Sequence, residues 1–263
     1  MELGVLIAKA RKDKGLTQSQ LAERLGVSAE AVSKWETGGY RPGGGNLDRL
    51  EEILRLSWYD ENGEMKSGRI FDEEHMSSFL KGKFASGGFP EAQKALLYAK
   101  EKHSATKPRK GPGKVPYISH PLTMTCHALA MGLEDDVLLA SLLLHDVVEE
   151  CGISPDDLPF GAEVRKIVTL VSKSASGYDP DKYFDGVASE PKACLVKCID
   201  RCNNLGTMAS GFTRKKIAEY IRETEERYPR LLKVIKEIPS FNNAAWLLRY
   251  QMKCLLETAK KIG

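Results

Sequence analysis

A histidine and an aspartate stand side by side at the end of the longest apolar run in the chain. His145 and Asp146 directly follow Val137–Leu144, whose composition predicts a buried helix. An unpaired carboxylate in or near the core is costly, so a partner is expected, and a cation is the simplest one. Glu149 and Glu150 follow four residues later, on the same helix faces as His145 and Asp146. Three acids and a histidine this close together predict a metal site.

A second polar group lies on the segment KACLVKCIDRCNNLGTM, residues 192–208, whose other positions are largely apolar or thiol. Asp200, Asn204 and Thr207 recur at helical spacing and therefore share one stripe of a predicted helix. The stripe either lines a site inside the protein or forms a solvent-facing strip. Its spacing alone leaves both interpretations open.

Basic residues gather between residues 100 and 114, against the single acid Glu101. Prolines and glycines interrupt this stretch, which predicts a loop rather than a helix. Guanidinium and ammonium groups pair strongly with phosphate oxygens, so the loop is either a solvated surface or a site for a phosphate-rich ligand. Its basic residues are Lys100, Lys102, Lys107, Arg109, Lys110 and Lys114.

Three motifs, in this order, resemble the HD-superfamily hydrolase domain of RelA/SpoT proteins and small alarmone hydrolases. They are PRKGPGKVPYISHPL, LLLHDVVEECG and VKCIDRCNNLGTM, which begin at residues 108, 142 and 196. The resemblance covers residues 90 to about 235 and implies an all-helical hydrolase domain. It also implies a four-ligand metal site with open positions for water, which suits Mn²⁺ or a similar divalent cation. The implied ligands are His120, His145, Asp146 and Asp200.

The same resemblance implies roles for the residues around this metal. Glu149 and Glu150 stand where the family usually has a Glu-Asp pair that orients or deprotonates the attacking water. A basic pair of the family binds the substrate's phosphates, and two polar residues of the last motif contact the nucleotide and support the site. In this chain the basic pair falls on Arg109 and Lys110, and the polar residues fall on Asn204 and Thr207.

For this family the implied reaction is removal of the 3′-pyrophosphate from the guanosine nucleotide (p)ppGpp. This chain departs from the family pattern in its Glu-Glu pair and in the sequence DRCNN, where the family usually has DRLHN. Two other interpretations therefore stay open: hydrolysis of another phosphorylated nucleotide, or a transcription regulator whose HD-like domain only senses a nucleotide. The presence of all four ligand-type residues and both acids favours catalysis.

The first 56 residues predict short helices with tight breaks. Thr17 and Ser28 suit helix N-caps, and Gly15 and Gly26 suit helix ends. The segment RKDKGLTQSQLAERLGVSAEAVSKWETG, which begins at Arg11, resembles the Cro/XRE class of phage-repressor DNA-binding domains. In that class the third helix enters the major groove of DNA.

This second resemblance implies an ion pair between Arg11 and Glu36 and a set of residues that face DNA. Residues 1–56 carry nine lysines and arginines against eight acids, a net charge of +1, so one copy has little electrostatic attraction for DNA phosphates. We therefore expect DNA to be bound by a homodimer, with a purely structural N-terminal domain as the alternative. The DNA-facing residues are Gln18, Ser28, Ala29, Glu30, Ser33 and Lys34.

Apolar residues at helical spacing recur along most of the chain and predict an all-α fold. We expect residues 1–56 to form the helix-turn-helix domain and residues 90–263 to form the hydrolase domain. Residues 57–89 are expected to connect them, and Asn62-Gly63 within this connector is a signal for a short β-hairpin.

The overall composition excludes several classes of protein. A chain of 263 residues that is 42% hydrophobic and 29% charged is neither disordered nor fibrous. The longest apolar run is too short to span a membrane, and the first residues lack the pattern of a signal peptide. We therefore expect a cytoplasmic protein without a membrane partner, in which the six cysteines are reduced thiols.

Overall fold

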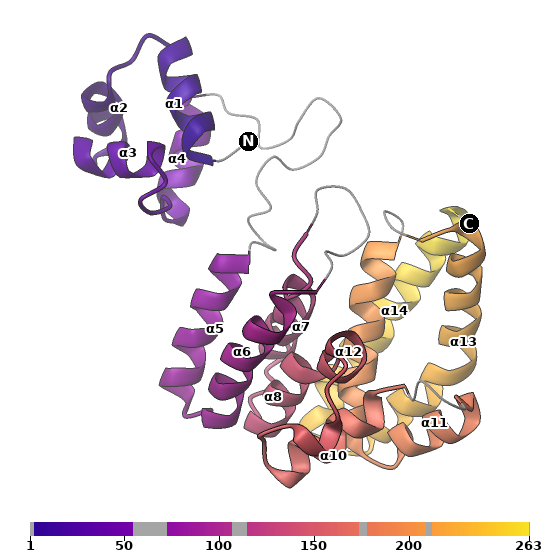
Figure 1. Cartoon of the computed structure of the whole chain (residues 1–263). Coiled ribbons are helices and arrows are strands. Elements are labelled where there is room, and N and C mark those ends of the chain that lie inside the picture. The colour runs from indigo at the N-terminus through magenta and orange to yellow at the C-terminus, as the bar shows by residue number, and fades with distance from the viewer. Residues whose placement is uncertain (1–2, 55–72, 107–114, 174–177, 209–211, 263) are drawn as a thin grey trace. The chain divides into compact units, whose positions relative to one another are not determined.

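The chain divides into two compact units in the computed structural model, Met1–Ile70 and Phe71–Gly263. The structure describes residues 3–54, 73–106, 115–173, 178–208 and 212–262. All regular secondary structure in these ranges is helical, which confirms the predicted all-α class (Figure 1). The hairpin expected at Asn62-Gly63 lies outside the described residues. No helix in the described ranges combines the length and apolar composition that a membrane span needs.

The N-terminal unit is a bundle of four short helices. Thr17 caps the second helix by accepting a hydrogen bond from Gln20 N, and Ser28 caps the third by accepting one from Ala31 N. Gly26 ends the second helix in the left-handed region, with φ 66°, as its sequence position predicts. The helices are α1 (Leu3–Asp13), α2 (Gln18–Leu25), α3 (Ala29–Glu36) and α4 (Gly44–Leu54).

Two features hold α1 against α3. Arg11 on α1 forms an ion pair with Glu36 at the end of α3, with Nε 2.5 Å from Oε1 and Nη2 2.9 Å from Oε2. Gly4 lies so close to the end of α3 that an added Cβ would stand 2.5 Å from the carbonyl oxygen of Trp35. The ion pair that the Cro/XRE resemblance implied is therefore present, and its two side chains are largely shielded from solvent, at 10% and 6% exposure.

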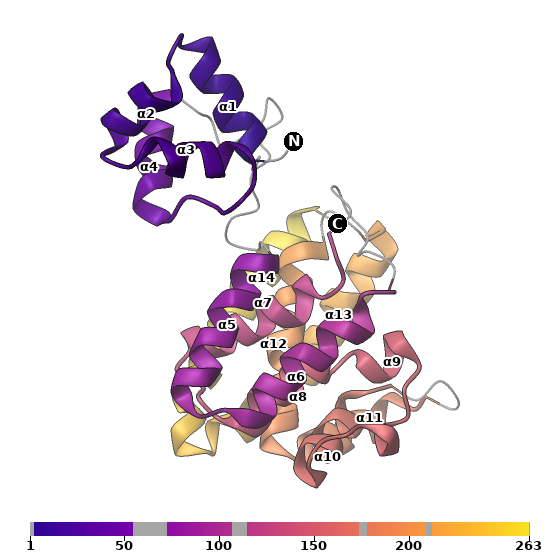
Figure 2. The same ribbon diagram turned by 60° about the vertical axis from the view of Figure 1, so that its left-hand side comes forward.

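The second unit is a larger bundle in which the most apolar helix lies at the centre. Helix α8 is buried over Leu138–Leu144 and packs against α6, α7, α10 and α12 (Figure 2). The helices of this unit are α5 (Glu73–Gly87), α6 (Pro90–His103), α7 (Ser119–Ala130), α8 (Asp136–Leu144), α9 (Val147–Cys151), α10 (Ala162–Val171), α11 (Pro180–Ala188), α12 (Pro191–Thr207), α13 (Arg214–Lys236) and α14 (Asn242–Ile262).

The prediction that residues 57–89 form a connector is wrong over most of the second half of this range. Residues 73–87 form α5, which packs on α6 and α7 and belongs to the second unit. Its buried residues Met76, Leu80 and Phe84 recur every fourth position, which is the spacing of one helix face. Burial of these three large apolar side chains explains why the segment is helical.

The helix that the sequence predicts to continue from Val137–Leu144 through Glu149 and Glu150 is interrupted at His145 and Asp146. Helix α8 ends at Leu144, His145 and Asp146 form a turn, and α9 begins at Val147. The carbonyl of Asp146 still accepts a hydrogen bond from Glu150 N, at 2.8 Å, so the two acids stay about one turn beyond the His-Asp pair. The turn thus brings His145 and Asp146 to the end of a buried helix.

The Arg11–Glu36 pair provides a test of how the N-terminal unit is held together. We expect Arg11→Met to destabilise this unit by about 3–5 kcal/mol, because it leaves the Glu36 carboxylate buried without its counter-charge. Hydrogen exchange of the α1 and α3 amides measures the effect locally. The exposed Lys9→Met on the same helix is the matched control. Unchanged amide protection in Arg11→Met would show that the pair contributes little.

Candidate metal centre

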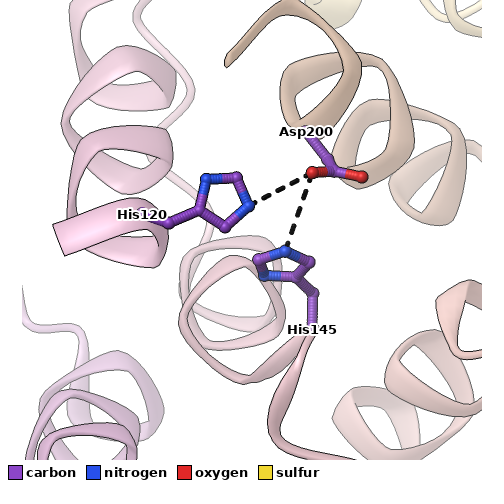
Figure 3. A group of neighbouring side chains, drawn as sticks. All are labelled: His120, His145 and Asp200. Carbon is purple, nitrogen blue, oxygen red and sulfur yellow. Dashed lines mark ion pairs between the residues drawn. The ribbon is translucent and has the colours of Figure 1, made fainter. Parts of the chain in front are cut away.

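Three helices of the second unit bring two histidines and an aspartate together. His120 comes from the first turn of α7, His145 from the turn after α8, and Asp200 from the middle of α12. Their ligand atoms all lie within 4.8 Å of one another, and all three residues are buried (Figure 3). The Asp200 Oδ1 atom lies 3.2 Å from His120 Nε2 and 3.9 Å from His145 Nε2.

Asp146 completes the group of four ligands that the resemblance implied. Its Oδ1 lies 3.1 Å from His145 Nε2, and its Oδ2 lies 3.7 Å from His120 Nε2. Both imidazoles therefore direct Nε2 toward both carboxylates. The side chain of Asp146 is 19% exposed, so this edge of the group is the one open to solvent.

The chemistry of these four side chains fits a divalent cation. His145 Nε2 is buried and finds no hydrogen-bond partner among the described residues, although Asp146 Oδ1 is close. Such an orphaned nitrogen beside two carboxylates is costly unless a cation or a proton lies between them. Two imidazole nitrogens and carboxylate oxygens are ligands that Mn²⁺, Fe²⁺ and Zn²⁺ all accept.

Electrostatics keep the carboxylates of this centre ionised. Burial alone would raise the pKa of Asp200, but Lys197 and the two imidazoles hold it well below its usual range. Burial has the opposite effect on His145 and would lower its pKa. The charges of Asp146 and Asp200 outweigh that effect, so the pKa of His145 is raised overall. Both carboxylates of the centre are thus ionised, and Lys197 balances part of the charge on Asp200.

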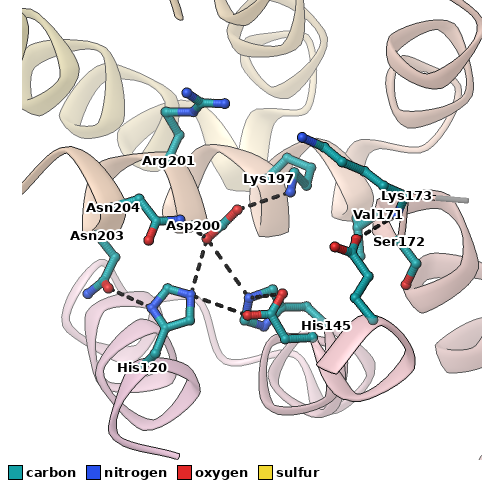
Figure 4. Close-up of polar contacts among 12 residues, drawn as sticks. His120, His145, Val171, Ser172, Lys173, Lys197, Asp200, Arg201, Asn203 and Asn204 are labelled. Atoms are coloured by element: carbon teal, nitrogen blue, oxygen red, sulfur yellow. Dashed lines mark hydrogen bonds and ion pairs between the residues drawn. The ribbon is translucent and has the colours of Figure 1, made fainter. Parts of the chain in front are cut away.

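Neighbouring side chains hold the ligands in place (Figure 4). Lys197 Nζ lies 3.0 Å from Asp200 Oδ2, and Asn204 Nδ2 donates a hydrogen bond of 2.6 Å to Asp200 Oδ1. Tyr117 donates its hydroxyl proton to Asp146 Oδ2, at 2.7 Å. Contacts within the protein therefore orient both carboxylates without a bound metal.

The four residues predicted to bind substrate occupy different places. Asn204 contacts a ligand, as described, and Thr207 is exposed, with its hydroxyl bonded to the carbonyl oxygen of Asn203. Arg109 and Lys110 lie outside the described residues. Substrate contact therefore stays a prediction for all four, while Asn204 has a clear supporting contact with Asp200.

Glu149 and Glu150, the predicted catalytic acids, are both exposed on α9. Glu149 Oε1 accepts a hydrogen bond of 2.6 Å from the backbone amide of Lys173, which follows α10. This bond connects the acid pair to the segment after α10. Their role in handling water stays a prediction.

Three supporting residues were not found from the sequence. Tyr117 and Asn203 lie within the recognised motifs, and Lys197 lies on the predicted helix beside the polar stripe. Lys197 and Asn203 are polar residues that stand three positions before and after Asp200 on a buried helix. This spacing was the available signal for both of them. The partner of Lys197, Asp200, lies on the same helix, whereas the partner of Asn203, His120, is brought close by the packing of α7 on α12, which spacing along the chain does not reveal.

The residues predicted to face DNA form a mixed set. Glu30 and Lys34 are exposed on α3, whereas Val32 and Trp35 face the core of the N-terminal unit. Ser28 is exposed and serves as the N-cap, and Gln18 is half-buried and donates a hydrogen bond of 2.8 Å to Glu36 Oε2. Ala29 and Ser33 are half-buried.

Comparison with known proteins identifies both units. Residues 7–60 match the helix-turn-helix family model HTH_3. A stretch of 143 residues, 50% of this chain, is 32% identical to the guanosine-3′,5′-bis(diphosphate) 3′-pyrophosphohydrolase MESH1 of Xenopus tropicalis and covers 79% of that protein. The chain belongs to this hydrolase family.

Longer relatives of the family match over the same unit. The chain is 31% identical over 150 residues to the guanosine-3′,5′-bis(diphosphate) 3′-pyrophosphohydrolase of Aquifex aeolicus (54% of this chain), and 31% over 153 residues to the bifunctional (p)ppGpp synthase/hydrolase SpoT of Escherichia coli (53% of this chain). In both cases it spans only 21% of the relative's length.

A solved structure supports the fold of the hydrolase-like unit. It is described as "A metazoan ortholog of SpoT hydrolyzes ppGpp and plays a role in starvation responses". The similarity has a TM-score of 0.52 and covers 64% of this chain and 95% of that chain. Sequence identity is 22%, so this similarity shows the shared fold alone.

The metal centre is tested most simply through Asp200. We expect wild-type protein loaded with Mn²⁺ and desalted to retain about one ion per chain, and Asp200→Asn to lose it, because the substitution removes a ligand charge and keeps the size. Elemental analysis measures the content. Asp185→Asn, an exposed substitution on α11, is the control. Equal metal content in wild type and Asp200→Asn would contradict the ligand assignment.

Proposed function

We propose that the second unit is a metal-dependent phosphohydrolase that removes the 3′-pyrophosphate of (p)ppGpp. The observation that carries this proposal is the convergence of four ligand-type side chains, His120, His145, Asp146 and Asp200. Family membership supports the same activity, since the MESH1 relative is named for this reaction.

His120, His145, Asp146 and Asp200 would hold the metal, and Mn²⁺ is the ion we favour because mixed imidazole and carboxylate ligands with open positions suit it. A divalent ion held there would lower the pKa of a water molecule and so would supply a nucleophile at neutral pH. The supporting contacts of Lys197, Tyr117 and Asn204 fix the directions of the ligand carboxylates in advance.

The chain's own acids and bases complete the proposed mechanism. Glu149 or Glu150 takes up the proton from the attacking water and later returns one to the leaving group. The hydrogen bond from Lys173 N fixes one oxygen of Glu149, so its other oxygen is the one available for this transfer. Arg109 and Lys110 are proposed to neutralise charge on the pyrophosphate.

A substrate panel separates this proposal from its two alternatives. Purified protein with Mn²⁺ is incubated with ppGpp, pppGpp, GTP and ATP, and the products are separated by anion-exchange chromatography. We expect GDP or GTP together with pyrophosphate from the first two nucleotides. Preferential hydrolysis of another nucleotide would change the substrate, and tight nucleotide binding without turnover would favour a sensor.

The acid pair gives a sharper test of the mechanism. We expect Glu149→Gln and Glu150→Gln to retain Mn²⁺, while at least one of them loses ~100-fold or more in turnover, the scale of general acid/base catalysis. Glu101→Gln, an exposed substitution on α6, is the control. Full activity in both variants would place the proton transfer on another group.

We also propose that the N-terminal unit binds DNA as a dimer. The HTH_3 match over residues 7–60 supports DNA binding, and the exposed side chains of Glu30 and Lys34 suit a recognition helix. With a net charge of only +1 in residues 1–56, phosphate attraction alone is weak. A dimer doubles the contacts and places two α3 helices about 34–36 Å apart on a two-fold site.

DNA binding is tested by selecting bound sequences from a random duplex pool at near-physiological salt. We expect a two-fold motif, and weaker binding in Lys34→Ala and Gln18→Ala with hydrolysis unchanged, because both residues belong to the N-terminal unit. Lys9→Ala on α1 is the control. An unpaired half-site, or no enriched motif, would favour a purely structural N-terminal unit.

A further inference from the structure

Helix α12 contacts both nitrogens of the His120 ring. Asp200 Oδ1 lies 3.2 Å from Nε2, and Asn203 Oδ1 lies 2.7 Å from Nδ1, on the other side of the ring (Figure 4). Asp200 and Asn203 are three residues apart and therefore project from neighbouring positions of one helix. The ring of His120, itself 3% exposed, is thus held between two side chains of α12.

The contact with Asn203 selects one form of the imidazole. An amide oxygen only accepts hydrogen bonds, so the 2.7 Å contact requires the proton of His120 to be on Nδ1. A neutral imidazole protonated at Nδ1 carries its lone pair on Nε2. That atom is the one that faces Asp200 Oδ1 and Asp146 Oδ2.

The second histidine of the centre receives the same support from the backbone. The Nδ1 atom of His145 lies 2.9 Å from the carbonyl oxygen of Leu142, an acceptor that no side-chain substitution removes. His120 differs because its acceptor is a side chain, half-buried on α12. Asn203 therefore offers a way to disturb the orientation of one metal ligand without changing any ligand.

We propose that Asn203 is a positioning residue that sets the tautomer and ring orientation of His120 and thereby strengthens metal binding. This inference rests on the metal centre of the proposed function and adds a residue that is not one of the four proposed ligands. Removing such an outer hydrogen bond typically weakens metal affinity by about 10–100-fold. The effect requires the acceptor oxygen, and not the size of the side chain.

Two substitutions separate the acceptor from the volume. Asn203→Leu keeps a similar size and removes the acceptor, so we expect the Mn²⁺ dissociation constant to rise by about 10–100-fold. Asn203→Asp keeps an acceptor oxygen at the same position and is expected to bind Mn²⁺ at least as tightly as wild type. Asn243→Leu, on the exposed surface at the start of α14, controls for the amide-to-leucine change itself.

The measurement is calorimetric titration of the metal-free full-length protein with Mn²⁺, with thermal unfolding in chelator to check each variant's fold. If Asn203→Leu does not fold, Asn203→Ala removes the acceptor without apolar bulk and is titrated instead. Weakened binding that Asn203→Asp restores would support the proposal.

Equal Mn²⁺ affinity in wild type and the acceptor-free variant would overturn it while leaving the proposed hydrolase intact. Equal losses in Asn203→Leu and Asn203→Asp would assign Asn203 a packing role and would also overturn it. Absence of Mn²⁺ binding by the wild type would overturn both this inference and the metal premise of the proposed function.

Discussion

Two ionised carboxylates lie among histidines where the helices of the second unit meet, and the arrangement of this unit follows from keeping them there. Asp200 is buried, and Asp146 is mostly shielded, so their charges must be balanced within the protein. Lys197 balances part of the charge on Asp200. The proposed divalent cation between the carboxylates and the Nε2 atoms of His120 and His145 would balance the remainder. The proposed chemistry would then depend on the same electrostatic requirement.

The apolar helices explain how such a polar centre is built inside a bundle. Helix α8 is buried along its length and stops where His145 and Asp146 begin, so the polar pair emerges at the end of an apolar helix. Helix α12 is buried through most of its length and carries one polar stripe, which supplies Asp200 as a ligand and Asn204 as its support. The surrounding core fixes both helices, and this rigidity positions the ligands before metal binding.

Three of the four proposed ligands could be predicted from the sequence because they stand out against their surroundings, whereas His120 was implied only by the family resemblance. His145-Asp146 ends an apolar run, and Asp200 interrupts a buried helix, so both are visible without any structure. The resemblance also implied a supporting role for Asn204, which lies one turn from Asp200, whereas the support from Asn203 could not be predicted, because its bond with His120 joins residues 83 positions apart. The error over α5 has another cause, since the spacing of Met76, Leu80 and Phe84 was a local signal for this helix. Local spacing thus predicts which side chains are unusual, and tertiary packing decides what they contact.

The proposed function depends most on a single cation bound between His120, His145, Asp146 and Asp200. Crystals of the full-length protein soaked in Mn²⁺, with diffraction data collected at the manganese absorption edge, locate the ion independently of any activity. We expect one strong anomalous peak within coordination distance of both Nε2 atoms and of carboxylate oxygens from Asp146 and Asp200. Electron density at the four side chains without an anomalous peak between them, or a peak bound elsewhere, would contradict the account.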